Sequence, residues 1–379
     1  MDPPVDLTKL GPAVARILDP KTPAPLRQMG AKGIAPGLKP HEAVTVIALL
    51  AESTDETISK PAQTTLEKLP APLLMGAINP DLPPGVIDVL APRYATNASV
   101  MERFLALPQI LLETVANIAV RASEAVAELI AINEERMLQH PPIIEKLYLN
   151  KATRMSTADR LIELAVRNKV ELTGIPAFKE AASAIADELI PEPTAEPSFD
   201  DLEFQKAEEI AKGIQIDPTT EDTHQIDNST GEEVVVDKVK PLYAQLASMS
   251  ISNKIRRAQV GNGAERMILV RDPDRRVAVA AIKSPQAQES EVTRISASRN
   301  VCEDVLRAIA MDKEWTRNHQ VKFNLVSNPR CPLTFAAKLL PLLREHELKA
   351  IAKSKNVGGA VANQAKERLL KKEKADKGK

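Results

Sequence analysis

Seven basic side chains within residues 254–276 carry the clearest possible chemistry in this sequence. They are Lys254, Arg256, Arg257, Arg266, Arg271, Arg275 and Arg276. Closely spaced ammonium and guanidinium groups attract anions, and arginine can hold a carboxylate or phosphate through two parallel hydrogen bonds. The group predicts a surface that binds nucleic acid, an acidic protein or an anionic membrane face. The alternative is a solvated surface whose charge is offset by acidic residues of the same chain.

The charge is distributed unevenly along the chain. Residues 1–190 carry 19 basic and 23 acidic side chains, whereas residues 191–236 carry 13 acidic side chains and two lysines. Residues 237–379 carry 29 basic and 15 acidic side chains, so the formal net charge of −1 hides a strong asymmetry. A tethered segment acts at a high effective concentration. We therefore expect the acidic segment to lie on the basic part and to compete there with an anionic partner.

Motifs of the common catalytic and metal sites are absent from the sequence, which has no P-loop, nucleophile elbow, H-E-x-x-H or C-x-x-C. The turn Gly261-Asn262-Gly263 precedes an expected helix, whose free N–H groups can bind an anion. A simple helix stop and restart is the favoured interpretation. The histidines are scattered, and Cys302 and Cys331 are interpreted as buried thiols. We expect no enzymatic activity, no cofactor and no metal.

The composition favours a globular helical protein. Hydrophobic residues make up 44% of the chain and aromatic residues only 3%, while 29 prolines mark many short elements. Two cysteines argue against a disulfide scaffold, and the first residues do not resemble a signal peptide. The longest apolar run, residues 46–51, is far shorter than the ~20 residues of a membrane helix. These features predict a cytoplasmic protein without membrane insertion.

Short helices with breakers between them are predicted along most of the chain. In residues 315–370, Phe335, Leu339, Leu342 and Leu343 follow helical spacing, which predicts Leu339 and Leu342 in the core. Residues 202–210 form an amphipathic piece within the acidic segment. None of these helices is long enough to be stable alone, so each needs neighbours.

Four similar boxes separate some of the expected helices. Each box follows a short apolar run, begins with Asp or Asn and precedes an expected helix, and three of the four contain two prolines. The boxes are residues 19–23, 79–83, 150–154 and 328–332. Asp or Asn can end one helix or cap the next, and proline fits a first helical turn. Units of this kind bury their apolar faces by stacking.

On these residues the chain resembles the leucine-rich repeat variant and wider HEAT-like α-solenoids. Asp312 to Trp315, then Val321-Lys322, then residues 328–332 match the order of the family's D-x-x-W entry, V-R pair and N-P-x-T-P box. The C-terminal half is also similar to modules of uncharacterised deltaproteobacterial proteins. The first box spacings, 60 and 71 residues, are irregular, and the clustered cysteines of the family's iron–sulfur module are absent.

The sequence therefore predicts an all-α protein. Two arrays of short stacked helices, residues 1–190 and 237–379, are expected to be joined by an acidic flexible linker, residues 191–236. The predicted function is a non-catalytic cytoplasmic scaffold or adaptor that binds a protein partner through a helical-repeat surface. The alternative is nucleic-acid binding by the basic C-terminal array, although the scarcity of aromatic residues weakens a single-strand stacking mode.

Overall fold

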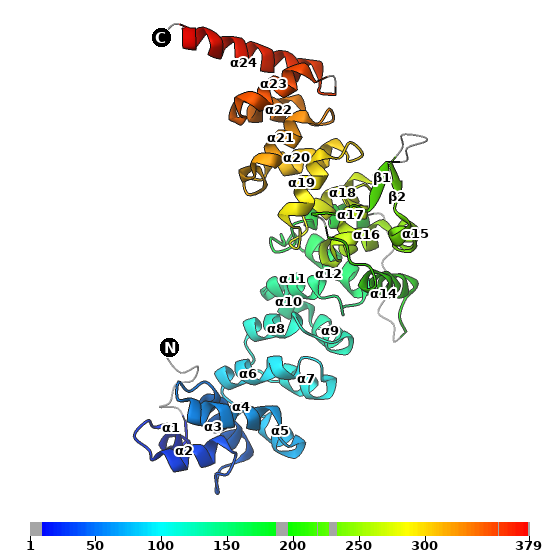
Figure 1. Ribbon diagram of the computed structural model, residues 1–379. Helices are drawn as coiled ribbons and strands as arrows, with labels where there is room; N and C mark the ends of the chain where they lie inside the picture. The colour runs from blue at the N-terminus through cyan, green and yellow to red at the C-terminus, as the bar shows by residue number, and fades with distance from the viewer. Residues whose placement is uncertain (1–9, 187–195, 218, 227–232, 355, 378–379) are drawn as a thin grey trace. The chain divides into compact units, whose positions relative to one another are not determined.

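The structure is a computed structural model in which helices account for nearly all regular secondary structure (Figure 1). The prediction of an all-helical fold is confirmed, apart from one two-stranded sheet among the described residues. The chain divides into two compact units, Met1–Thr153 and Arg154–Lys379. The structure describes residues 10–186, 196–217, 219–226, 233–354 and 356–377.

The first unit is built from short helices, most of which open with proline or with a side-chain cap. Asn97 and Asn133, for example, each accept a hydrogen bond from a backbone N–H of the helix that they precede. Its elements are α1 (Pro12–Leu18), α2 (Ala24–Ala31), α3 (Pro40–Ala51), α4 (Glu56–Glu67), α5 (Ala71–Ala77), α6 (Pro84–Leu90), η2 (Ala91–Tyr94), α7 (Ala98–Leu105), α8 (Leu112–Ala119), α9 (Glu124–Ala131), α10 (Glu134–Gln139) and α11 (Pro142–Leu149).

Helix α3 is the centre of the first part of this unit. All its residues from Val44 to Ala51 are buried, and it packs against α1, α2, α4, α5 and α6. Further along the chain, α7 packs on α9, and α8 packs on both α9 and α11. Each helix thus buries its apolar side against helices close to it in the chain, as short helices must.

The second unit continues this pattern of short helices. Its elements are α12 (Met155–Arg167), α13 (Phe178–Ile185), α14 (Phe199–Lys212), β1 (His224–Ile226), β2 (Glu233–Val235), η3 (Asp237–Val239), α15 (Lys240–Ser248), α16 (Ile251–Val260), α17 (Gly263–Leu269), α18 (Arg275–Ile282), α19 (Glu289–Ala297), α20 (Glu303–Met311), η4 (Trp315–Arg317), α21 (His319–Ser327), α22 (Leu333–Leu339), η5 (Leu340–Leu342), α23 (Glu345–Lys353) and α24 (Gly359–Lys377). The strands β1 and β2 pair antiparallel, with His224 opposite Val235.

Part of the acidic segment, residues 191–236, forms a packed helix rather than a flexible linker. Helix α14 packs against α12, α15 and α16, and it buries Phe204. Ser198 and Asp201 form a reciprocal capping box at its start. Asp201 also accepts hydrogen bonds from the backbone N–H and the hydroxyl of Ser156, at 2.9 and 3.2 Å. The net negative charge predicted disorder, but one apolar face and a good cap are sufficient to order this helix.

Two of the four boxes make the same long-range contact. The side-chain amide of Asn150 donates to the carbonyls of Ala119 and Ala122, which lie 31 and 28 residues earlier, at 2.9 and 2.8 Å. The amide of Asn328 donates to carbonyls 32 and 30 residues earlier, at 3.0 and 2.8 Å. In both boxes the amide oxygen accepts from the backbone N–H two residues on. Each asparagine therefore ties its turn to the end of a helix about 30 residues before it.

The expected helix face in residues 335–343 is only partly correct. Helix α22 ends at Leu339, which is buried, and a 3₁₀ turn follows. Leu342 is 58% exposed, so the prediction that it lies in the core is wrong. Leu343 returns to the interior.

Candidate functional site

Arg256 and Arg257 lie in the interior of the second unit rather than on its surface. Arg256 is 0% and Arg257 1% exposed, and the guanidinium carbon of each lies 4.6 Å from the centre of the Phe204 ring. An aromatic face attracts a guanidinium group most strongly when both are removed from water. Arg256 also donates to the carbonyl of Arg154 at 3.2 Å. The two arginines thus hold the helix of the acidic segment.

Arg257 is neutralised by carboxylates within the protein. Its Nε donates to Glu265 Oε1 at 2.7 Å, and its Nη2 lies 2.6 Å from the same oxygen. Glu208, from α14, lies 3.5 Å from Nη1. Glu265 also accepts from the backbone N–H of Asn262, in the capping box that starts α17. The Gly261–Gly263 turn is therefore a helix stop and restart, as the favoured interpretation predicted.

Arg266 and Lys254 are also paired and removed from most solvent. Arg266 forms two hydrogen bonds with Glu291 and donates a third to the carbonyl of Gly261 at 2.8 Å. Lys254 lies 3.2 Å from Asp272, and the two side chains are 13% and 10% exposed. Neither cation presents an open face to an external anion.

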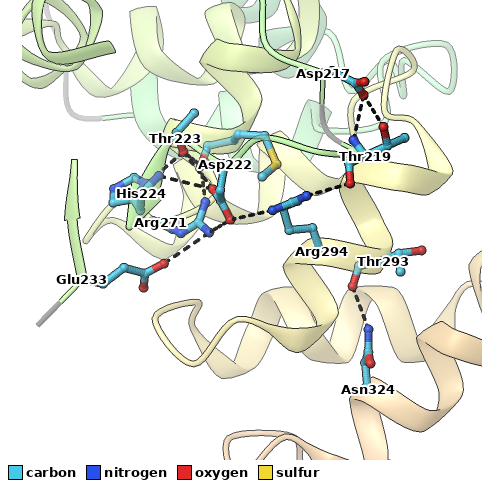
Figure 2. A network of polar contacts seen from close by, with 11 residues as sticks. Asp217, Thr219, Asp222, Thr223, His224, Glu233, Arg271, Thr293, Arg294 and Asn324 are labelled. Atoms are coloured by element: carbon cyan, nitrogen blue, oxygen red, sulfur yellow. Dashed lines mark hydrogen bonds and ion pairs between the residues drawn. The ribbon is translucent and has the colours of Figure 1, made fainter. Parts of the chain in front are cut away.

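Arg271 belongs to a polar network that includes two acidic residues of the segment 191–236. Its Nη2 lies 3.2 Å from Asp222 Oδ2 and 3.5 Å from Glu233 Oε1. Arg294 approaches the same Asp222 oxygen at 3.9 Å, as Figure 2 shows. The side chain of Arg271 is only 5% exposed. Acidic side chains of the same chain thus offset this charge, which was the alternative to a surface that binds an external anion.

Arg275 and Arg276 differ from the other five because they line a hollow. Arg275 is 78% exposed in its side chain and lies 4.0 Å from Asp304. Arg276 forms two hydrogen bonds with Asp274, at 3.1 and 2.8 Å, and donates to the carbonyl of Ser183 at 3.0 Å. The side-chain hydrogen bonds from Arg276 hold the pKa of the Asp274 carboxyl below its usual range. The seven predicted residues therefore do not form one exposed surface.

The hollow is a groove of about 700 Å³ between α13, α18 and α20. Its apolar lining is Val279, Ala308 and Met311, and Met311 is 68% exposed at the end of α20. A second hollow of about 420 Å³ shares Ser183, Arg275 and Arg276 with it. The charged lining residues of the larger groove are Lys179, Glu180, Arg275, Arg276, Lys283, Asp304, Arg307 and Asp312.

Polar contacts lie on all three helices of the groove, and one of them joins α18 to α13. Lys283, at the end of α18, lies 2.8 Å from Glu180 of α13. Arg307 pairs with Asp304 at 3.1 Å along α20. The second oxygen of Glu180 is buried and, within the described residues, has no hydrogen-bond partner.

The sequence did not point to Lys179, Lys283 and Arg307 as members of one site. Lys179 and Arg307 lie more than 100 residues apart in the chain, so only the tertiary fold brings them to the same groove. One signal was visible. Asp304, Arg307, Ala308 and Met311 follow i, i+3, i+4 and i+7 spacing, which places them on one face of a helix. An exposed methionine at the end of that face marks a surface able to contact a partner.

The remaining histidine, cysteine and carboxylate side chains do not form a metal site among the described residues. No three His, Cys, Asp or Glu side chains there gather as metal ligands. Burial raises the pKa of the Cys331 thiol to about 11, which suits a packed thiol rather than a nucleophile. His319 contacts Glu347, with its Nε2 at 2.8 and 2.9 Å from the two oxygens.

Comparison of the chain with protein-family models, curated proteins and solved structures found no match. Within the described ranges, none of the helices combines the length and apolar character needed to cross a membrane.

Proposed function

We propose that the protein is a HEAT-like helical-repeat scaffold, without catalytic activity, that binds a protein partner at the groove between α13, α18 and α20. The repeat character is supported by Asn150 and Asn328, which make equivalent contacts about 30 residues back along the chain. Stacked short helices present broad surfaces suited to protein recognition. The cytoplasmic location and the resemblance to the leucine-rich repeat variant stay predictions from the sequence.

The observation that carries this proposal is the mixed chemistry of the groove. Apolar side chains lie between charged ones, and Glu180 and Asp304 stand among the cations. An interface with a protein needs an apolar centre and a polar rim. A phosphate backbone would meet these carboxylates at close range and would gain little from Val279 and Met311. Pairing of Lys254, Arg257, Arg266 and Arg271 with internal carboxylates further weakens the nucleic-acid alternative.

The test is capture of partners from a native lysate with the full chain as bait, followed by calorimetry with the purified candidate. The Met311→Asp variant is the matched negative bait, since this exposed side chain can change without disturbing the core. We expect a candidate that binds the wild-type chain and loses affinity for the variant. Equal binding to both baits would remove the groove from the proposal. A gel shift of duplex DNA that survives physiological salt would favour the alternative function instead.

A further inference from the structure

We infer that the groove between α13, α18 and α20 takes a short acidic peptide segment that carries one large apolar side chain. This inference rests on the proposed function and names the chemistry of the partner. It follows from two features of the groove, its uncompensated charge and its apolar lining.

The lining of the groove carries more cations than carboxylates, so its net charge is positive. The cations are Lys179, Arg275, Arg276, Lys283 and Arg307, and the carboxylates are Glu180, Asp304 and Asp312. Lys283 is compensated by Glu180, Arg276 by Asp274 and Arg307 by Asp304, all at 3.1 Å or less. Arg275 is 78% exposed, and its nearest carboxylate, Asp304, lies 4.0 Å away.

Lys179, on α13, is exposed and shows no ion pair with another described residue. Arg275 and Lys179 therefore form a cationic rim on two different helices. Carboxylates of a bound segment complement such a rim.

The interior of the groove supplies contacts of a different kind. Met311, Ala308 and Val279 line it, and a flexible thioether adapts to side chains of different shape. A leucine or phenylalanine placed here would cover the exposed Met311 and gain the free energy of apolar burial. A peptide can carry both acidic and apolar side chains, whereas nucleic acid would bring phosphate close to the carboxylates of Glu180 and Asp304.

The test uses the full chain and fluorescein-labelled synthetic peptides, with binding measured by fluorescence anisotropy. The first peptide has a central leucine flanked by glutamates and aspartates. In the second, glutamine and asparagine replace the acids, and in the third, serine replaces the leucine. We expect the first to bind most tightly and the other two to bind more weakly.

Groove variants then locate the site. Charge reversal in Lys179→Glu or Arg275→Glu should weaken the acidic peptide about three- to tenfold at low salt. Met311→Ser should weaken it about tenfold without a comparable salt dependence. The control is Lys349→Glu on α23, an exposed lysine that does not line the groove, and it should bind as the wild type does. Thermal unfolding monitored by circular dichroism checks that every variant stays folded.

Three results would overturn the inference. The first is equal binding of the acidic and neutral peptides. The second is an affinity for the acidic peptide that none of the three groove variants changes. The third is tighter binding of labelled duplex DNA that the groove variants weaken as they weaken peptide binding. If a captured protein partner depends on Met311 but the acidic peptide does not bind, the proposed function stands and the acidic segment is wrong. If neither depends on the groove, both fail.

Discussion

Arg266 and Glu291 form a buried ion pair that joins α17 to α19. Two hydrogen bonds link them, Nε to Oε2 at 3.0 Å and Nη2 to Oε1 at 2.7 Å, and their side chains are 5% and 3% exposed. Paired, planar hydrogen bonding of this kind compensates much of the cost of removing both charges from water. Arg266, which the sequence places in a cluster of basic residues, therefore stabilises the interior of the protein and does not belong to a basic surface.

Loss of one partner from this pair should be costly. Glu291→Ala leaves a buried guanidinium without its carboxylate, and we expect about 3–5 kcal/mol of destabilisation in denaturant unfolding. The control is Glu303→Ala, which breaks the half-exposed pair with Arg307 and should cost less than about 1 kcal/mol. Equal costs for the two variants would mean that the Arg266 pair is solvated in solution. Replacing both partners, with Arg266→Met and Glu291→Leu, should restore much of the loss.

The bridging asparagines should be sensitive to a change of one atom. Asn328→Asp replaces the amide that donates to two carbonyls by a carboxylate oxygen that repels them, although the side chain keeps its shape. We expect the free energy of unfolding, measured by chemical denaturation at neutral pH, to fall by about 1–3 kcal/mol. Asn300→Asp, at an exposed position in the same half of the chain, should change the stability little. If the two variants behave alike, the bridge contributes nothing to stability.

Docking of α14 should depend on one aromatic ring. Phe204 is 2% exposed and lies beside Arg256 and Arg257, so Phe204→Ala should cost about 3–5 kcal/mol and expose α14 to hydrogen exchange. Phe199, the first residue of the same helix, is 73% exposed, and Phe199→Ala should have little effect. Rapid exchange of α14 in the wild-type chain would restore the expectation of a flexible linker.

The short helices were predictable from the sequence because periodicity and proline are local signals. Their ends were less predictable. The spacing of Leu339 and Leu342 continues a helix, but Pro341 lies in a 3₁₀ turn, where the rise and rotation per residue differ. This change turns Leu342 outward and leaves Leu339 in the core.

The fate of the basic cluster was not predictable, because it depends on carboxylates that other helices bring. Glu265 stands beside Arg266, and Glu291 lies among polar and charged neighbours, so the local sequence does not mark either carboxylate as paired in the interior. Phe204 lies about 50 residues before the arginines that it contacts. The groove could not be predicted for the same reason, since its three helices come together only through the tertiary fold.

Stability should depend on pH through His224. Its ring lies against Tyr243, and its Nδ1 is 2.8 Å from the Thr223 hydroxyl. Burial, helped by the charge of Arg271 and opposed by Asp222, lowers the pKa of His224 to about 4. The folded protein therefore keeps this histidine neutral at pH values where the unfolded chain, with a pKa of 6.5, takes up a proton.

Because the folded-state pKa of His224 is depressed, its contribution to stability is complete above pH 6.5 and is lost as the pH falls from 6.5 toward 4. We expect a loss of about 1–2 kcal/mol by pH 4.5, a size that allows for solvent screening of a partly exposed ring. Urea unfolding at pH 7.5 and pH 4.5 measures it. In His224→Gln, the difference in the free energy of unfolding between pH 7.5 and pH 4.5 should shrink by that amount. His346→Gln, at an exposed histidine, should keep the wild-type difference. An unchanged pH dependence in His224→Gln would show that this ring accepts a proton in the folded protein as readily as in the unfolded chain.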